Sequence, residues 1–307
     1  MRRRGTVLPG AGLLFALIAH GDAAADVLQV NRAVITVLWA GHAPVLGRPG
    51  VLDWIRRSAS IVSAYYGEFP TTPVTITVTG VAGDRVMNGR TVGQPRARIG
   101  LNVGTGVTAP ILQGDWILVH EMIHLAAPEL ADEQNWLAEG LATYVEGIAR
   151  VRAGNLSEAD LWDEYVHDMP KGLPHRDDQG LDHTHTWART YWGGALFCLV
   201  ADVRIREQTG NRVGLQEALR AVERAGGGMQ IPWSAQRVFA TGDGATGTHV
   251  LADLYAEMKD RPATPDLAAL WADLGIRTGE EGVRFDETAR LASVRRAMTA
   301  HTAFASD

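Results

Sequence analysis

Two histidines and a glutamate near the middle of the chain are spaced like metal ligands. His120 and His124 are four residues apart, so on an α-helix they lie about 40° apart around the axis and share one face. Fourteen residues separate His124 from Glu139, which lies in the segment Trp136-Leu137-Ala138-Glu139-Gly140. Two imidazoles with one carboxylate are an established ligand set for catalytic zinc, which keeps its fourth position for water. The spacing therefore predicts one Zn²⁺ per chain.

Glu121 is placed to act as a base beside that metal. It follows the first histidine directly, about 100° further around the helix, so it can miss the metal and still reach water bound there. Zinc lowers the pKa of bound water towards 7, and a nearby carboxylate can accept the proton that is released. These four residues together predict hydrolytic chemistry.

Two helices must hold these groups. The run from Trp116 to Leu125 is apolar on most sides apart from the two histidines and Glu121, and Pro128 stops it. The run from Glu133 to Arg152 has apolar residues at helical spacing, namely Trp136, Leu137, Leu141, Tyr144, Val145 and Ile148. We expect the second helix to pack against the first and to bring Glu139 to the histidines.

The motif H-E-M-I-H followed by W-L-A-E-G-L-A-T-Y-V-E resembles the gluzincin metallopeptidases. These include the aminopeptidase N-like enzymes, the glycyl aminopeptidases and the shorter peptidase-MA-like domains. A third block, from Tyr191-Trp192-Gly193-Gly194 to Thr209-Gly210, is similar to the segment where those aminopeptidases carry a tyrosine that hydrogen-bonds the tetrahedral intermediate. The resemblance covers residues 51–275. It implies zinc ligands at His120, His124 and Glu139, and catalytic residues at Glu121 and Tyr191.

Two departures from the family pattern bear on the substrate. The spacing from His124 to Glu139 is shorter than in aminopeptidase N-like enzymes and points to the compact peptidase-MA-like members. No G-x-M-E-N-like segment precedes His120, where the chain has only Ile99-Gly100-Leu101-Asn102. In the family, that glutamate holds the free amino terminus of a substrate. The resemblance therefore implies an endopeptidase or an enzyme that processes blocked amino termini.

Other functions agree with the same residues. A catalytically silent peptide-binding protein could keep zinc as a structural fixture, but a structural site closes its fourth position and needs no base such as Glu121. A hydrolase of a non-peptide substrate is the other alternative, because one member of the superfamily hydrolyses an epoxide at the same metal. The leading expectation is an exported zinc metallopeptidase acting on peptide or protein substrates.

The amino terminus resembles a secretory signal peptide over residues 1–25. Arg2, Arg3 and Arg4 precede the short apolar run from Ala11 to Ala19, and Ala23-Ala24-Ala25 offers a cleavage site before Asp26. The apolar run is too short to span a bilayer, although an uncleaved anchor is the alternative. We expect a periplasmic or secreted protein without stable membrane insertion after cleavage. Removing three arginines and Asp22 changes the formal net charge from −6 to −8. An acidic chain without a basic cluster argues against nucleic acid as a partner.

The remaining residues, 26–307, predict a single metallopeptidase domain of the α+β class. Composition is ordinary for a globular protein, with 46% hydrophobic and 21% charged residues. The only cysteine is Cys198, so the chain can form no internal disulfide. The resemblance implies a thermolysin-like gluzincin catalytic domain, with a small N-terminal mixed sheet, a zinc-binding helix pair and a mostly helical C-terminal half. Residues 26–110 should be mainly strands plus one helix, and residues 111–307 mainly helical.

Alternation and turn residues predict where the main elements lie. Strands are expected at Val27–Val30, Ala33–Trp39, Thr71–Thr79, Arg96–Val103 and Val283–Phe285, and a loop at Gly80–Gly93. Helices are expected at Pro49–Tyr66, Thr186–Gln208, Val213–Arg224, Ala235–Ala240, Thr248–Met258, Asp266–Leu274 and Glu287–Thr299. The strand at Arg96–Val103 should border the cleft, because gluzincins bind the substrate backbone as an added strand on an exposed edge. Gly193 and Gly194 inside a helix predict close approach of another backbone.

Several further polar residues carry two interpretations each. Glu146, two turns after Glu139, could orient a ligand histidine or be a plain surface glutamate. His183 and His185 could bind a second metal or the substrate, although loop histidines usually do neither. Three aspartates, Asp177, Asp178 and Asp182, could suggest calcium, but a solvated acidic loop is the favoured interpretation.

Overall fold

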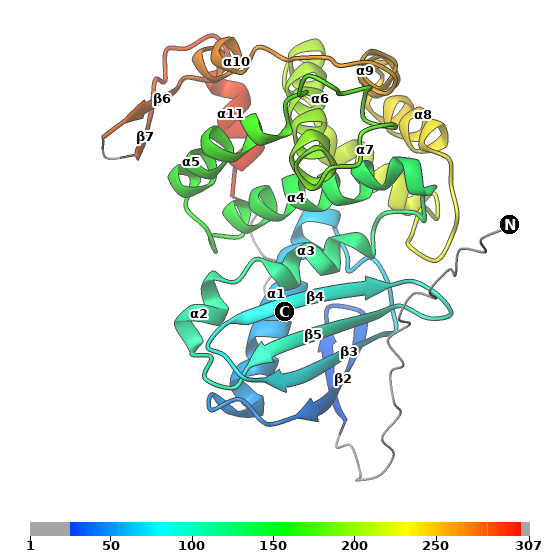
Figure 1. Cartoon of the computed structure of the whole chain (residues 1–307), viewed down its shortest axis with the longest axis vertical. Helices are drawn as coiled ribbons and strands as arrows, with labels where there is room; N and C mark the ends of the chain where they lie inside the picture. Colours follow the sequence, from blue (N-terminus) through cyan, green and yellow to red (C-terminus); the bar gives the residue numbers. More distant parts are fainter. Residues whose placement is uncertain (1–24, 281, 302–307) are drawn as a thin grey trace, which may run out of the picture.

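The computed structural model describes residues 25–280 and 282–301. Apart from Ala25, the predicted signal peptide lies outside these residues. Within the described ranges, no helix has both the length and the apolar character needed to cross a membrane. Figure 1 shows two stacked parts, a β-sheet below and a group of helices above, with α3 and α4 between them.

The N-terminal part is a mixed sheet, as predicted, and it has five strands in the order β1-β2-β3-β5-β4. The three central strands are parallel, and the two edge strands run antiparallel to their neighbours. The strands are β1 (Asp26–Val30), β2 (Ala33–Gly41), β3 (Val74–Val81), β4 (Val86–Val92) and β5 (Arg98–Gly104). Alternation in β3 buries Val74, Ile76 and Val78 and leaves its threonines half-buried. The buried side chains of the sheet share one apolar core with helix α1 (Gly47–Tyr66).

Strand β4 forms the edge of the sheet that lies beside α3. Two predictions about this edge are wrong. The predicted loop at Gly80–Gly93 is wrong because Val86–Val92 forms a strand, and the expected edge strand, β5, is paired on both sides. The dipeptide Asn88-Gly89 favours a turn. Here it lies inside a strand, where a Cβ on Gly89 would lie 2.5 Å from Cγ of Glu121. The glycine is needed for the close approach of Glu121, not for a turn.

The predicted helix pair is present as α3 (Ile117–His124) and α4 (Asn135–Arg152), which pack against each other. A π-helical turn, Arg189–Gly193, leads into α6 (Gly194–Thr209), which packs on α4. The other α-helices and strands of the described ranges are α2 (Ala109–Gly114), α5 (Glu158–Asp168), α7 (Leu215–Arg224), α8 (Ala235–Thr246), α9 (Val250–Met258), α10 (Leu267–Leu274), β6 (Ile276–Gly279), β7 (Gly282–Phe285) and α11 (Ala292–Thr299). Helices α2 and α5 are additions to the predicted set. The start of α5 has an N-cap, since Ser157 Oγ accepts from the backbone N–H of Asp160.

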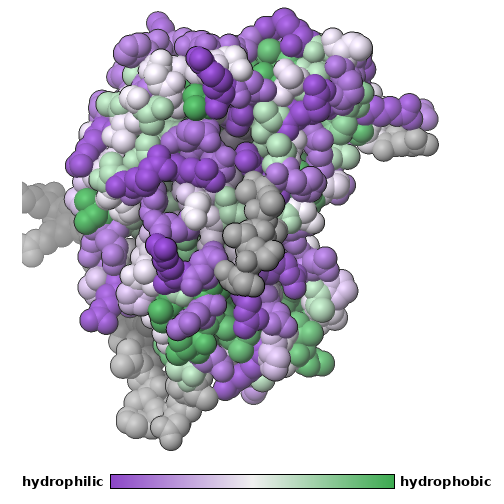
Figure 2. Space-filling model, turned by 180° about the vertical axis from the view of Figure 1, so that it is seen from behind, coloured by the Kyte–Doolittle hydropathy of each residue, from purple (hydrophilic) through white to green (hydrophobic). Residues whose placement is uncertain are grey.

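Hydrophobic side chains gather inside the molecule. The largest fully buried ones include Trp54, Trp136 and Trp162, and the free thiol of Cys198 is buried as well. Seen from behind, the surface is mainly hydrophilic, with hydrophobic residues more frequent over the lower half, where the sheet lies (Figure 2). The fold thus buries a large apolar core without a disulfide.

Helices α4 and α6 cross at two glycines. A Cβ on Gly194 would lie 2.1 Å from the carbonyl oxygen of Trp136, and one on Gly140 would lie 2.3 Å from Cα of Gly194. The close backbone approach predicted for the Gly193-Gly194 pair is therefore confirmed at Gly194. Because Gly140 follows Glu139 directly, this crossing helps to set where the carboxylate of Glu139 stands.

We expect Gly194→Ala to lower the free energy of unfolding by about 1–3 kcal/mol, because the added methyl group must push two backbones apart. Gly244→Ala is the matched control, since Gly244 lies in α8 with nothing within 4 Å of its would-be Cβ. Alanine there should stabilise the protein by up to about 1 kcal/mol through helix propensity. Urea denaturation measures both effects, and equal stability of the Gly194 variant and the wild type would contradict the packing described.

Candidate metal centre

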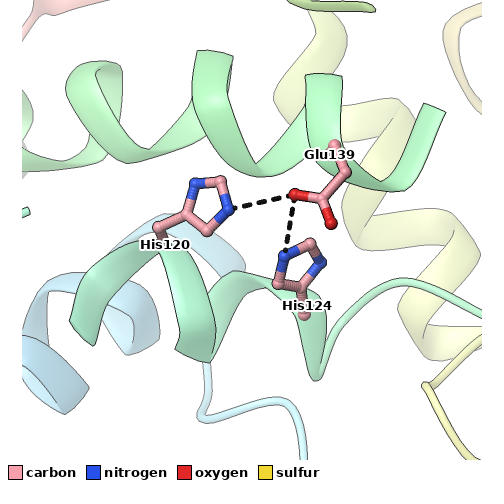
Figure 3. Close-up of side chains that lie close together, drawn as sticks. All are labelled: His120, His124 and Glu139. Carbon is pink, nitrogen blue, oxygen red and sulfur yellow. Dashed lines mark hydrogen bonds and ion pairs between the residues drawn. The ribbon is translucent and has the colours of Figure 1, made fainter. Parts of the chain in front are cut away.

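The three predicted ligands come together between α3 and α4. Helix α3 presents His120 and His124, and Glu139 on α4 points towards both (Figure 3). One carboxylate oxygen of Glu139, Oε2, lies 3.3 Å from Nε2 of His120 and 3.5 Å from Nε2 of His124. Among the residues that the structure describes, no other three His, Cys, Asp or Glu side chains converge in this way. All three side chains are largely buried.

The separations of these donor atoms suit a tetrahedral zinc ion. Ligand atoms at the usual zinc distances, in tetrahedral geometry, lie about 3.3–3.5 Å from one another. The two nitrogen-to-oxygen distances around Oε2 of Glu139 fall in that range. The donor set, two imidazole nitrogens and one carboxylate oxygen, is also one that zinc prefers.

The charges around these atoms favour a metal-binding state. Burial lowers the pKa of His120, with Glu139 partly opposing it. Burial also acts to raise the pKa of Glu139, but the hydrogen bonds and charge of the two histidines outweigh it and hold that pKa well below its usual range. For His124, interactions with Glu139 and Glu121 outweigh burial and raise the pKa. A neutral His120 and an ionised Glu139 are the forms that bind metal, and binding displaces any proton from His124.

Glu121 faces β4 from α3 and lines the same cleft as the three ligands. Its carboxylate oxygen Oε2 lies 2.5 Å from the hydroxyl oxygen of Thr91, which is also 2.8 Å from the backbone oxygen of Glu121. Gly89 packs against the side chain from the same strand. Strand β4 therefore holds the carboxylate of Glu121 beside the three predicted ligands, and Glu121 is not part of that ligand group.

The cleft has a volume of about 530 Å³. Strand β4 lines it from Gly89 onwards, and so do residues 127–132, which follow α3. Two glutamines join neighbouring loops. Nε2 of Gln94 donates to the backbone oxygen of Gln230 at 2.6 Å, and Nε2 of Gln230 donates to the backbone oxygen of Gly93 at 3.1 Å. These two bonds join the segment that follows β4 to the segment that holds Gln230.

Tyr191 reaches the cleft from the π-helical turn and stacks on His120, with 6.2 Å between ring centroids and 15° between planes. Burial raises its pKa to about 12, assisted by Glu139 and Glu121, so the phenol is protonated at neutral pH and can donate a hydrogen bond. Arg189, fully buried in the same turn, donates to Asp178 at 2.7 Å and to the backbone oxygen of Gly172 at 2.7 Å. Such π-helical turns are frequent at functional sites.

Two of the three aspartates in the loop before this turn are buried, so the expected solvated acidic loop is wrong for them. Asp178 is paired with Arg189, and Asp182 accepts from the indole N–H of Trp136 at 2.7 Å and from the hydroxyl of Tyr255 at 2.5 Å. Both carboxylates are therefore engaged by protein donors, not arranged for calcium. Because Trp136 precedes Glu139 by one helical turn, Asp182 helps to anchor the ligand-bearing helix.

The other candidate residues lie outside the metal centre. His183 is exposed and forms an ion pair with Asp260 at 3.0 Å, and His185 is exposed. Glu146 is buried and accepts from Arg150 at 2.6 Å, so neither interpretation given for it holds. In the described ranges, Nδ1 of His120 has no hydrogen-bond partner.

Sequence reasoning missed Gly89 and Thr91, which contact Glu121, and two aromatic neighbours of the site. Trp116 contacts His120 edge to face, and Trp187 stacks on Tyr191. The run Thr91-Val92 carried a signal for a strand, since β-branched residues favour one. The tryptophans carried a weaker signal, their position shortly before the segments that hold His120 and Tyr191.

No protein-family model and no curated protein sequence matches the chain. Solved structures do match it. An aminopeptidase N family protein from Idiomarina loihiensis superposes with a TM-score of 0.65 and 14% identity, over 88% of this chain and 53% of that one. An M1 zinc metallopeptidase from Deinococcus radiodurans gives a TM-score of 0.50 and 16% identity, over 78% and 51%. A variant of that enzyme with a bound Tyr-Ser-Ala substrate gives 0.51 and 14%, over 78% and 52%.

The chain spans about half the length of these structures. At these identities the likeness concerns the fold. The resemblance to aminopeptidase N-like enzymes that the motifs predicted is confirmed at that level. The chain folds as a mixed α+β unit, with an N-terminal mixed sheet and a helical remainder, like part of these aminopeptidase N family and M1 metallopeptidase structures.

Proposed function

We propose that the protein is a zinc-dependent peptidase of the gluzincin type, with His120, His124 and Glu139 as ligands and Glu121 as general base. The observation that carries the proposal is the convergence of three ligand atoms beside a carboxylate that a separate element, β4, holds in the same cleft. A purely structural metal site gives no reason for that arrangement. The shared fold with M1 zinc metallopeptidases supports the same conclusion.

In this proposal, the residues of the site divide the steps of peptide hydrolysis among them. Zinc at the three ligands would lower the pKa of a water molecule and polarise the scissile carbonyl. Glu121 would accept a proton from a water molecule while the oxygen atom of that water bonds to the carbonyl carbon. When the carbon–nitrogen bond breaks, Glu121 returns the proton to the leaving amine. The hydroxyl of Thr91, 2.5 Å from the carboxylate, keeps Glu121 oriented between the two transfers.

The substrate backbone is expected to lie along β4. This strand has its outer edge unpaired in the sheet, and residues from Gly89 to Val92 line the cleft. An extended peptide can add to such an edge by main-chain hydrogen bonds. The substrate-binding edge thus belongs to β4, not to β5 as the sequence had suggested.

Tyr191→Phe is expected to lower kcat by about 10²–10³ with KM little changed. The variant loses one hydroxyl donor that would contact the oxyanion mainly in the transition state. Tyr66→Phe is a suitable control because this buried tyrosine lies on α1, outside the cleft residues. Steady-state kinetics on a cleaved peptide decides the role. A raised KM with kcat preserved would make Tyr191 a substrate-binding residue instead.

The test of the function is a peptide-library digest with purified protein, with and without a chelator and after zinc is restored. We expect cleavage that the chelator abolishes and zinc restores. Peptide binding without cleavage would favour the silent binding protein.

Acetylated and free peptides of the same sequence should have similar kcat/KM, because β4 carries no glutamate to hold a free amino terminus. A strong preference for the free amine would point to Glu129 and Asp132, which line the cleft.

A further inference from the structure

Two tryptophans beside the metal centre are exposed, and neither has a role in the chemistry above. Trp116 directly precedes α3 and is 50% exposed, and Trp187 lies just before the π-helical turn and is 62% exposed. The chain has nine tryptophans, all within the described ranges, and these two are the exposed ones. Large apolar side chains are usually buried, so two exposed ones at the same site call for a ligand that covers them.

Ring contacts connect both tryptophans to the metal centre. Trp187 stacks on Tyr191 at 5.6 Å and 25°, and Tyr191 stacks on His120. Trp116 meets His120 edge to face, at 5.6 Å between ring centroids and 85° between planes. The four rings form one continuous row with a tryptophan at each end, so the two indoles border the same site from different elements.

The two inner rings of the row, those of His120 and Tyr191, line the cleft described above, and the tryptophans lie beyond them. The segment 127–132 that lines the cleft follows the C-terminal end of α3, whereas Trp116 stands at its N-terminal end. Neither tryptophan is among the residues lining the cleft. His120 and His124 lie on α3 between these two ends. A peptide whose scissile carbonyl is at the ligands therefore meets segment 127–132 on one side of that bond and the tryptophans on the other.

We propose that Trp116 and Trp187 form a subsite for an aromatic or large aliphatic side chain of the substrate, next to the scissile bond on the side away from segment 127–132. This inference rests on the proposed function. The indole faces offer apolar area whose burial favours such a side chain, and aromatic pairs gain further from offset or edge-to-face contact. The enzyme should thus select peptides by an apolar residue on that side.

The test uses quenched peptides in which one residue on either side of the cleaved bond is Phe, Leu, Lys or Ala. When the varied residue is on the side of the bond where the tryptophans lie, wild-type kcat/KM should be about tenfold higher with Phe or Leu than with Ala. Trp116→Ala and Trp187→Ala should bring that ratio close to one, measured for each variant against its own kcat/KM for the Ala peptide. Trp116→Phe and Trp187→Phe should keep most of the preference, because an aromatic face remains. Val45→Ala, at an exposed apolar residue outside the cleft, is the control.

The outcomes separate the two proposals. Chelator-sensitive cleavage with an unchanged Phe-to-Ala ratio in both alanine variants overturns the subsite and leaves the peptidase intact. A tryptophan-dependent preference for Lys also overturns it, since cation–π contact is then the basis of selection. Absence of chelator-sensitive cleavage for every peptide overturns the proposed function and the subsite with it. Zinc content is measured in each variant, because Trp116 contacts the ligand His120.

Discussion

His124→Ala should abolish tight zinc binding and, with it, all peptide hydrolysis. The imidazole nitrogen Nε2 of His124 is one of three donor atoms gathered within 4.8 Å of one another, and the structure supplies no substitute from the described residues. Two remaining ligands cannot close a site of the catalytic type. The loss should be visible as metal content after dialysis, which should fall from about one zinc per chain to a trace.

His183→Ala is the matched control for that measurement. This histidine also pairs with a carboxylate, Asp260, but is exposed and lies outside the metal centre. Its removal should leave zinc content and turnover unchanged. Circular dichroism checks that both variants remain folded. Undiminished zinc in the His124 variant would show that the ligands are misassigned.

Much of the metal centre is local in sequence, and that explains why it could be predicted. His120 and His124 share a face because helical geometry places residues four apart together, and the apolar run around them forces the helix to be buried. Glu139 needed one more step, the packing of α4 on α3, which the apolar spacing of α4 indicated. The structure has both helices close to the predicted ends.

The elements that support the site depend on contacts between distant residues, and sequence patterns do not show these. Strand β4 has few buried side chains of its own, so its sequence lacks the alternation that revealed β3 and β5. Gly89 reads as a turn residue until Glu121 is seen against it. Asp182 reads as a loop aspartate until Trp136 and Tyr255 are seen donating to it from other helices. In each case the partner is more than thirty residues away.

Glu121→Gln separates catalysis from binding. Glutamine keeps the size of the side chain and can still accept a hydrogen bond from the hydroxyl of Thr91, which lies 2.5 Å from the carboxylate in the wild type. The variant should therefore fold and keep its zinc. Glutamine cannot take up a proton at neutral pH. Turnover should therefore fall by at least the factor of about 10²–10⁴ that general-base catalysis supplies, while peptide affinity is retained.

Three measurements on the Glu121→Gln variant decide its role together: zinc content, kcat on a cleaved peptide and the Kd of that peptide by calorimetry. Glu133→Gln makes the same chemical change at an exposed glutamate outside the cleft, and it should behave as wild type in all three. If Glu121→Gln keeps turnover within tenfold of wild type, another group accepts the proton. The contacts of Gly89 and Thr91 with Glu121 would then serve only to pack β4 against α3. If the variant loses zinc instead, Glu121 contributes to metal binding. The assignment of three residues as ligands and of Glu121 as the base alone would then be wrong.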